Sequence, residues 1–66
     1  MNVRVNGDDR QVEDGATVAG LLSACGFPLR LVVVERNGRV VYPENWEATP
    51  VEAGDVFEIA SFVGGG

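Results

Sequence analysis

Histidine and lysine are absent from this chain, which has one cysteine, Cys25, and one tyrosine, Tyr42. General acid–base and nucleophilic catalysis use these four side chains more than most others. An enzyme made from this sequence would therefore have to work mainly with carboxylates. We predict that the protein is not an enzyme and acts instead as a binding module or as a protein substrate of another enzyme.

Long apolar runs are also absent. No stretch approaches the roughly 20 apolar residues that cross a bilayer, and the first residues lack the basic segment followed by an apolar one that marks a signal peptide. The single Cys25 cannot form a disulfide within the chain, which agrees with a reducing compartment. We expect a cytoplasmic protein with neither a membrane span nor a signal peptide.

Positive charge is scarce. Five arginines stand against ten acidic residues, so the formal net charge is -5. This charge opposes binding to nucleic acid phosphates and to anionic lipid, and it favours a basic protein surface as the partner. We therefore predict a protein partner, with no nucleic acid and no membrane.

The 66 residues suffice for one small domain, and its first part has the pattern of a hairpin. Met1, Val3 and Val5 alternate with polar residues, the period-two pattern of a half-buried strand. Asn6-Gly7-Asp8-Asp9 has the composition of a turn, because asparagine and glycine accept positive φ. We predict that a second strand returns over residues 10–13.

Residues 18–25 carry the pattern of an amphipathic helix. Apolar side chains recur there at i, i+3, i+4 and i+7, namely Val18, Leu21, Leu22 and Cys25. Thr17 can cap the start of the helix, and Gly26 followed by Pro28 is a natural stop. On this stripe Cys25 is predicted to pack as a small hydrophobic side chain, without a sulfur-carrying or redox role.

The next part of the sequence predicts a second hairpin. Asn37-Gly38 is the strongest short hairpin signal in the chain. It lies between apolar runs at residues 31–34 and 40–42, which are rich in β-branched side chains. Pro43 cannot continue the ladder and is expected to end the second run.

A last strand is expected over residues 56–62, after the turn Ala53-Gly54-Asp55. Between the hairpin and this turn, the irregular segment 44–52 contains Trp46, which we expect to anchor it against the core. The order β-β-α-β-β-β places one helix against one mixed sheet of about five strands. The expected fold class is α+β, a grasp-like roll.

The last strand has two unlike faces. If Phe57 and Ile59 face the helix, as their size suggests, Phe62 points toward solvent on the opposite face. We predict a docking patch for a partner protein on this outer face, consisting of Ala60, Phe62 and Val63 with Glu58 at its rim. The alternative is a single exposed aromatic side chain without a function, which is common on protein surfaces.

Acidic residues around the first turn suggest a metal site: Asp8, Asp9, Glu13 and Asp14. Counting back from Gly15 in the register of an EF-hand loop, however, puts Arg10 and Val12 at ligand positions. We expect solvated carboxylates and no metal site.

The chain ends in Phe62-Val63-Gly64-Gly65-Gly66, although three successive glycines contribute little to the stability of a fold. This ending is combined with three internal motifs, Gly15-Ala16-Thr17-Val18 followed by Leu21-Leu22, Asn37-Gly38-Arg39-Val40-Val41 with Trp46 downstream, and Ala53-Gly54-Asp55. Together they resemble the sulfur carrier (ThiS) family of thiamine biosynthesis, over nearly the whole chain. One departure is Tyr42-Pro43-Glu44, where such carriers often have Pro-Arg after the valines.

The resemblance implies a ubiquitin-like β-grasp domain over residues 1–63 and a flexible glycine tail at residues 64–66. It also implies that an ATP-dependent adenylating enzyme activates the carboxylate of Gly66 and that sulfide replaces the adenylate to give a thiocarboxylate. This group would donate sulfur to the forming thiazole ring on thiazole synthase, while Gly64 and Gly65 pass through a narrow channel of the partner. ATP and any metal would be bound by the partner, so no cofactor is expected on this chain.

Two alternatives to this function stay open from the sequence. One is a related β-grasp sulfur carrier for molybdopterin or another sulfur product, or a ubiquitin-like protein modifier. The other is an interaction domain whose terminal glycines are only a frayed end.

Overall fold

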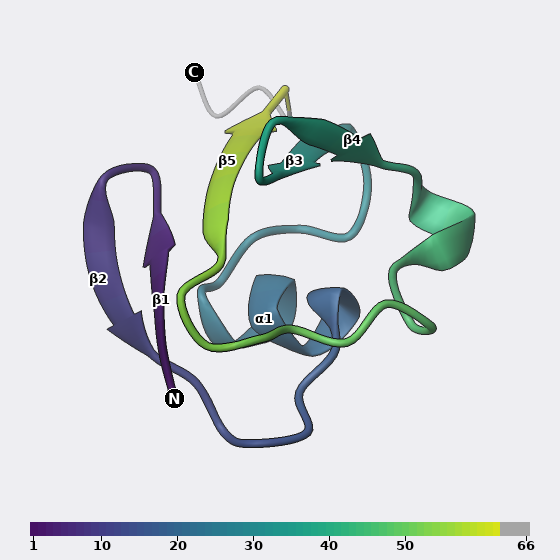
Figure 1. The fold of residues 1–66 in the computed structure, drawn as a ribbon. Helices are drawn as coiled ribbons and strands as arrows, with labels where there is room; N and C mark the ends of the chain where they lie inside the picture. Colours follow the sequence, from purple (N-terminus) through teal and green to yellow (C-terminus); the bar gives the residue numbers. More distant parts are fainter. Residues whose placement is uncertain (63–66) are drawn as a thin grey trace.

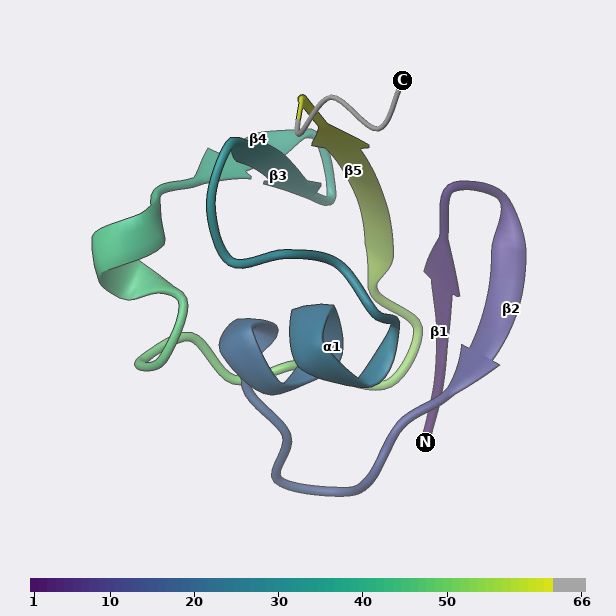
Figure 2. The ribbon, with the colours of Figure 1, turned by 180° about the vertical axis from the view of Figure 1, so that it is seen from behind.

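The computed structural model describes residues 1–62. Within these residues a five-stranded sheet, with the strand order β2-β1-β5-β3-β4, packs against one α-helix (Figures 1 and 2). The elements are β1 (Asn2–Val5), β2 (Asp8–Gln11), α1 (Val18–Ala24), β3 (Val32–Arg36), β4 (Arg39–Val41), the 3-10 helix η1 (Pro43–Asn45) and β5 (Val56–Ser61). The β1–β5 pair is parallel and the other strand pairs are antiparallel. The sheet is therefore mixed, and the predicted α+β grasp-like roll is confirmed.

The first hairpin turns more tightly than its sequence suggests. Asn6 and Gly7 have φ values of 50 and 86°, which are both positive as a two-residue type I′ turn requires. The returning strand β2 therefore starts at Asp8, directly opposite Val5. The prediction that Asp8 and Asp9 belong to the turn was wrong, because the two-residue turn leaves no loop between the strands. The predicted strand over residues 10–13 was also wrong at its end, because β2 ends at Gln11, opposite the first residue of β1, Asn2.

The helix α1 begins and ends at the predicted signals. The Thr17 side chain accepts a hydrogen bond from the Gly20 amide over 3.2 Å. At the other end, Gly26 has a φ of 79°, and the amides of Gly26 and Phe27 donate back to the carbonyls three and five residues earlier. This is a Schellman C-cap. It makes Cys25 the capping residue, one position beyond the last helical residue.

With only 7 residues, α1 depends on tertiary contacts. The amides of Val18 and Ala19 donate to the carbonyls of Thr49 and Trp46, both over 3.0 Å. The segment after η1 thus satisfies two of the four amides that the start of a helix leaves without partners. Trp46 is 5% exposed, and its indole N–H donates to the Val41 carbonyl over 2.8 Å, so its predicted anchoring role is confirmed.

The second hairpin has the predicted turn but shifted strands. Asn37 and Gly38 both have positive φ, 52 and 82°. Strand β3 extends two residues past the predicted end at residue 34, and it starts one residue late because Leu31 has a φ of 54°, which interrupts an extended strand. β4 begins at Arg39, one residue before the predicted start, and ends at Val41. The first two residues of the segment 44–52, predicted to be irregular, belong to η1.

The core lies between α1 and the sheet. Its largest fully buried side chains come from three elements: Val18, Leu21 and Leu22 from α1, Val34 from β3, and Phe57 from β5. Strand β5 lies at the centre of the sheet, between β1 and β3, and this position buries Phe57 and Ile59 as predicted. Among residues 1–62, no helix is long and apolar enough to cross a membrane.

Candidate partner-docking surface

The end of β5 determines where the chain leaves the sheet. The strand ends at Ser61, and the Phe62 amide still donates to the Leu31 carbonyl over 2.7 Å. The Phe62 side chain is 65% exposed. The predicted sites at Val63, Gly64, Gly65 and Gly66 lie outside the described residues.

The structure brings together the three described members of the predicted docking patch. Glu58 and Ala60 alternate with the buried Phe57 and Ile59 along β5, so they lie on the outer face of the sheet. Phe62 follows them at the end of the same face. The geometry fits a docking patch, and its binding role stays a prediction.

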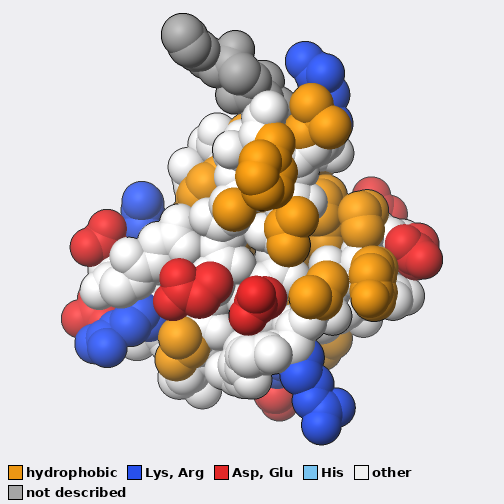
Figure 3. Space-filling model, turned by 90° about the horizontal axis from the view of Figure 1, so that it is seen from above, with side chains coloured by type: hydrophobic (Ala, Val, Ile, Leu, Met, Phe, Trp, Pro, Cys, Tyr) orange, Lys and Arg blue, Asp and Glu red, His pale blue; other side chains and the backbone are white. Residues whose placement is uncertain are grey.

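The outer face is larger and more apolar than the sequence reasoning indicated. In addition to Phe62, five exposed apolar side chains come from β3, β4 and their flanking segments: Leu29, Leu31, Val33, Val40 and Tyr42. Val33 lies opposite Ala60 in the ladder between β3 and β5. Figure 3 shows hydrophobic side chains gathered on this face, with acidic side chains beside them. We call the set Leu31, Val33, Val40, Tyr42, Ala60 and Phe62 the outer apolar face.

The contribution of β3 to this face was not evident from the sequence, because it comes from a run of three valines. Val32, Val33 and Val34 have identical side chains, so composition does not show which of them faces the helix. In the structure Val32 and Val34 are buried, whereas Val33 is 44% exposed. The available signal was the Asn37-Gly38 turn, because counting back from it assigns alternate residues to opposite faces.

Leu31 adopts a conformation that is unfavourable for its residue type. A left-handed φ of 54° costs a residue with a Cβ atom about 1–2 kcal/mol. The backbone is held there by the hydrogen bond from Phe62, while the side chain is 58% exposed. The fold thus maintains a strained leucine beside the exit of the chain from β5.

Asn6 fixes the middle of β5. Regular pairing between β1 and β5 covers only two residue pairs, and it ends at Val5 with Phe57. Beyond it, the Asn6 side-chain amide donates to the Ile59 carbonyl over 3.0 Å and accepts from the Ile59 amide over 2.7 Å. The asparagine side chain therefore takes the place of a neighbouring strand and holds the segment that carries Glu58 and Ala60.

A buried ionic cluster fixes the start of β5. Asp55 is 6% exposed and accepts hydrogen bonds from Arg36 Nε and the Glu52 amide, both over 2.8 Å, and from Asn37 Nδ2 over 3.0 Å. Burial acts to raise the pKa of Asp55, but the hydrogen bonds from Arg36, Glu52 and Asn37 outweigh it and hold that pKa below its usual value. The hydrogen bond to Asp55 likewise raises the pKa of Arg36. The cluster links the β3–β4 turn to β5.

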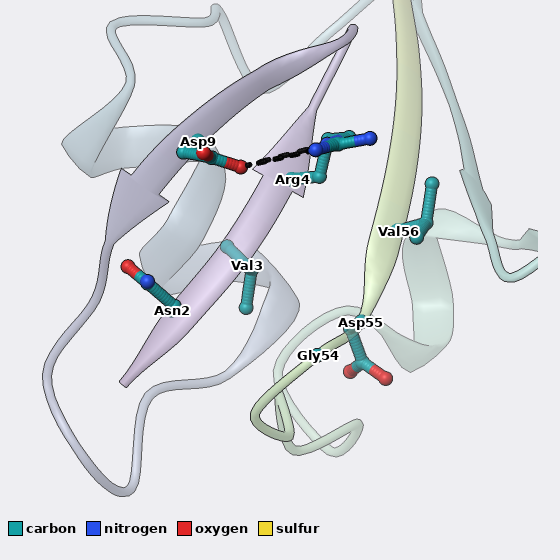
Figure 4. Close-up of a pocket in the computed structure, with 7 residues that line it drawn as sticks. All are labelled: Asn2, Val3, Arg4, Asp9, Gly54, Asp55 and Val56. Carbon is teal, nitrogen blue, oxygen red and sulfur yellow. Dashed lines mark hydrogen bonds and ion pairs between the residues drawn. The ribbon is translucent and has the colours of Figure 1, made fainter.

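Among residues 1–62, every acid and base that lines the hollow between β1, β2 and β5, of about 210 Å³, has an ion-pair partner. Figure 4 shows Arg4 directed toward Asp9, and their ion pair is 3.5 Å long. Asp55 points away from both, toward its own partners. The charged groups of this hollow are therefore paired with each other or with the neighbouring cluster.

A larger hollow, of about 430 Å³, lies between the end of β2 and α1, and Glu13 is its only ionisable lining residue among residues 1–62. The carboxylates of the predicted solvated group are all exposed: Asp8, Asp9, Glu13 and Asp14. The described part of the chain holds no group of three or more His, Cys, Asp or Glu side chains that could bind a metal ion. Cys25 is a partly buried free thiol that packs against the core, as predicted for a small hydrophobic side chain.

Comparison with known proteins gives consistent matches. The ThiS family model matches residues 3–66. The sulfur carrier protein ThiS of Bacillus subtilis is 34% identical over 65 residues, which cover 97% of this chain and 98% of that protein. The crystal structure of the thiamine biosynthesis protein (ThiS) from Geobacter metallireducens superposes with a TM-score of 0.82 at 40% identity, and the match covers 100% of both chains.

A thiazole synthase of Magnetococcus marinus is 38% identical over all 66 residues of this chain, which correspond to 20% of that protein. A thiazole synthase of Paramagnetospirillum magneticum gives the same identity and coverage. The chain thus spans about a fifth of the length of these two relatives. On the family match, the Bacillus relative and the shared fold, the chain belongs to the ThiS family.

Proposed function

We propose that this protein is a sulfur carrier of thiamine biosynthesis and that the carboxylate of Gly66 carries the sulfur as a thiocarboxylate. The observation that carries the proposal is the family match, which runs to residue 66 and so includes all three terminal glycines. The Bacillus relative, matched over almost its whole length, is named a sulfur carrier protein. The names of these relatives favour thiamine biosynthesis over the molybdopterin carrier and the protein modifier.

The chemistry explains why the terminus needs an activating partner. A free carboxylate is a poor electrophile, because its charge repels nucleophiles and it has no good leaving group. Formation of a mixed anhydride with AMP removes both obstacles, and sulfide can then displace AMP. Gly66 has no Cβ, so both faces of its carbonyl are open to the attacking sulfur.

The tail gives the reaction its reach. Four extended residues span at most ~13–14 Å, which is sufficient to carry a carboxylate from the surface of a domain into a partner's active site. Gly64 and Gly65 would occupy the narrow part of that path, where side chains do not fit. Glu58, Ala60, Phe62 and Val63 would dock the domain beside the entrance.

The protein acts in this scheme as a cosubstrate and not as an enzyme. An ATP-dependent adenylating enzyme would bind ATP and any metal and would supply the catalytic groups. Thiazole synthase would accept the sulfur, a partnership supported by the two relatives that bear this name and contain a matching region. ATP and a reduced sulfur donor suit a reaction in the cytoplasm.

Mass spectrometry of the intact protein tests the proposal. The chain is incubated with the adenylating enzyme of its own organism, ATP and a sulfur source, and the product is fragmented. We expect the mass change of one oxygen-to-sulfur exchange, located on Gly66. Deletion of Gly65 and Gly66 should abolish this exchange, and Gly66→Val should do so with the length restored, because a β-branched side chain crowds the carbonyl.

The control is Cys25→Ser, which should acquire sulfur like the native protein. Sulfur found on Cys25 of the native chain, or on the truncated chain, would show that the terminal carboxylate is not the carrier. Both tail variants should unfold at the native temperature, since terminal glycines make few packing contacts.

A further inference from the structure

Two carboxylates lie directly opposite each other on the outer face of the sheet. Glu35 of β3 pairs in register with Glu58 of β5. Side chains of such a pair leave the sheet on the same face, with Cβ atoms about 5 Å apart. Like charges in this position destabilise a sheet, so the unbound protein bears a cost for keeping both.

Neither carboxylate is neutralised within the described chain. The four ion pairs among residues 1–62 involve other acidic side chains, namely Asp9, Asp14, Glu52 and Asp55. Of the arginines on the sheet, Arg36 binds Asp55 and Glu52, and Arg4 binds Asp9. Arg39 of β4 is next to Val40, the ladder partner of Glu35, but among residues 1–62 it forms no ion pair with either carboxylate. Among residues 1–62, no hydrogen bond reaches the side chain of Glu35 or Glu58 either.

The pair borders a hollow that is partly lined by apolar side chains. This hollow of about 160 Å³ is lined by Asn6, Val33, Glu35, Glu58, Ile59 and Ala60. Beside it, Val40 lies opposite Glu35 in the ladder of β3 and β4, and is 46% exposed. Acidic and hydrophobic side chains adjoin on this face in Figure 3. Apolar side chains would partly shield a cation placed here from water. Its attraction to the two carboxylates would therefore be stronger than on an open surface.

We propose that the outer apolar face docks the adenylating enzyme and that one arginine of that enzyme lies between Glu35 and Glu58. The proposal rests on the proposed function and adds the chemistry by which the partner is recognised. A guanidinium presents several N–H donors in one plane, so it can bond two carboxylates, and its weak hydration suits an apolar setting. The stem of the arginine would lie along Val33 and Ala60.

The arrangement predicts opposite effects on stability and on binding. In the free protein, removal of one charge relieves repulsion. In the complex, the same change removes a partner of the arginine. A surface maintained for binding should therefore show variants that are more stable and bind less well, whereas a purely structural surface should not.

The experiment compares Glu35→Gln, Glu58→Gln and the double variant with a matched control, Glu44→Gln combined with Glu47→Gln. The control residues are exposed, lie in and after η1, and change the net charge by the same amount as the double variant. Dissociation constants for the adenylating enzyme of the same organism are measured by calorimetry, and melting temperatures by differential scanning calorimetry. The thiocarboxylate assay on the native chain is run in parallel.

We expect each single variant to bind about tenfold more weakly and to melt about 2–4 °C higher. The double variant should lose less affinity than the two single losses combined, because both carboxylates bind one arginine. The control should change affinity less than threefold and leave the melting temperature unchanged.

Three results would overturn the inference while leaving the proposed function intact. One is that the double variant and the control bind the adenylating enzyme with equal affinity, while the native chain still acquires sulfur on Gly66. Another is that the double variant loses binding to thiazole synthase but binds the adenylating enzyme like the native chain. The last is a native chain that forms dimers, which the double variant dissociates. A native chain that neither binds the adenylating enzyme nor acquires sulfur would refute both the inference and the proposed function.

Discussion

The two faces of the sheet are built from alternate residues of the same strands, yet they differ sharply in their exposure to solvent. Toward the helix, Phe57 and Val34 are 0% exposed. Toward solvent, Phe62 and Val33 are 65 and 44% exposed. Phenylalanine and valine occur on both faces, so the hydrophobicity of a side chain alone does not explain its exposure. Among residues 1–62, the single α-helix covers one face of the sheet, and the side chains of the opposite face stay exposed.

The largest effect should come from the buried side. Phe57→Ala removes a fully buried aromatic ring from the centre of the core. We expect a loss of about 3–5 kcal/mol in the free energy of unfolding, which is a large part of the stability of such a small domain. Urea denaturation measures it. A loss below about 1 kcal/mol would show that the core tolerates a cavity there and would weaken the contrast between the faces.

The buried side also contains Asp55, and its contribution to stability should depend on pH. Its folded pKa is lowered, so the unfolded chain takes up the proton first as the pH falls. The stabilisation is complete above the unfolded pKa of about 4 and is lost as the pH falls through the folded pKa. Asp55→Asn should cost about 2 kcal/mol at neutral pH, because hydrogen bonds to a charged group are lost.

Thermal unfolding between neutral pH and the acid range tests this point. The native protein should lose more stability than Asp55→Asn over that range. Glu44→Gln, a change at an exposed carboxylate, serves as the control and should follow the native curve. Parallel curves for the native protein and Asp55→Asn would mean that the buried cluster does not stabilise the fold as described.

The exposed side should respond in binding instead of stability. Phe62→Ala should leave the melting temperature nearly unchanged and should weaken the complex with the adenylating enzyme by about 1–3 kcal/mol, the usual range for an aromatic anchor. Calorimetry on the same sample measures both the melting temperature and the affinity. An equal loss of stability and of affinity would assign Phe62 to the core and not to the outer face.

The smallest effect is expected at Leu31. Glycine adopts a φ of 54° without steric cost, but it also gives the unfolded chain more freedom. Leu31→Gly should therefore stabilise the protein by about 0.5–1 kcal/mol. Its affinity for the partner should fall if the leucine side chain belongs to the outer apolar face. A more stable variant with native affinity would remove Leu31 from that face.

The predictions of turns, caps and strand ends were correct for features that depend on adjacent residues and wrong for features that depend on distant ones. The Asn37-Gly38 turn, the Thr17 cap and the Gly26 stop formed where the sequence indicated, and the first turn formed at Asn6-Gly7, the first half of the predicted segment. Each depends on the steric preferences of one or two residues. The start of β2 at Asp8 and the late start of β3 at Val32 were missed, because the ends of a strand depend on its partner strand and on backbone strain at Leu31.

The candidate site divides in the same way. Alternation along the last strand predicted that Phe62, Ala60 and Glu58 would lie on one outward face, and the structure agrees. The contribution of Val33 was concealed among identical valines. The opposition of Glu35 and Glu58 was not visible at all, since it depends on the register between strands that are far apart in the sequence.

The sequence by itself determined the turns, the helix and its caps, the faces of β5, the excess of acidic charge and the family, because each is written in residue types and short spacings. Tertiary structure alone decided which strands are neighbours. It thereby placed Asn6 against Ile59, Asp55 against Arg36, and two carboxylates side by side on an apolar surface. The physical reason is that strand order and register are settled by burying one common core, and no short segment contains that information.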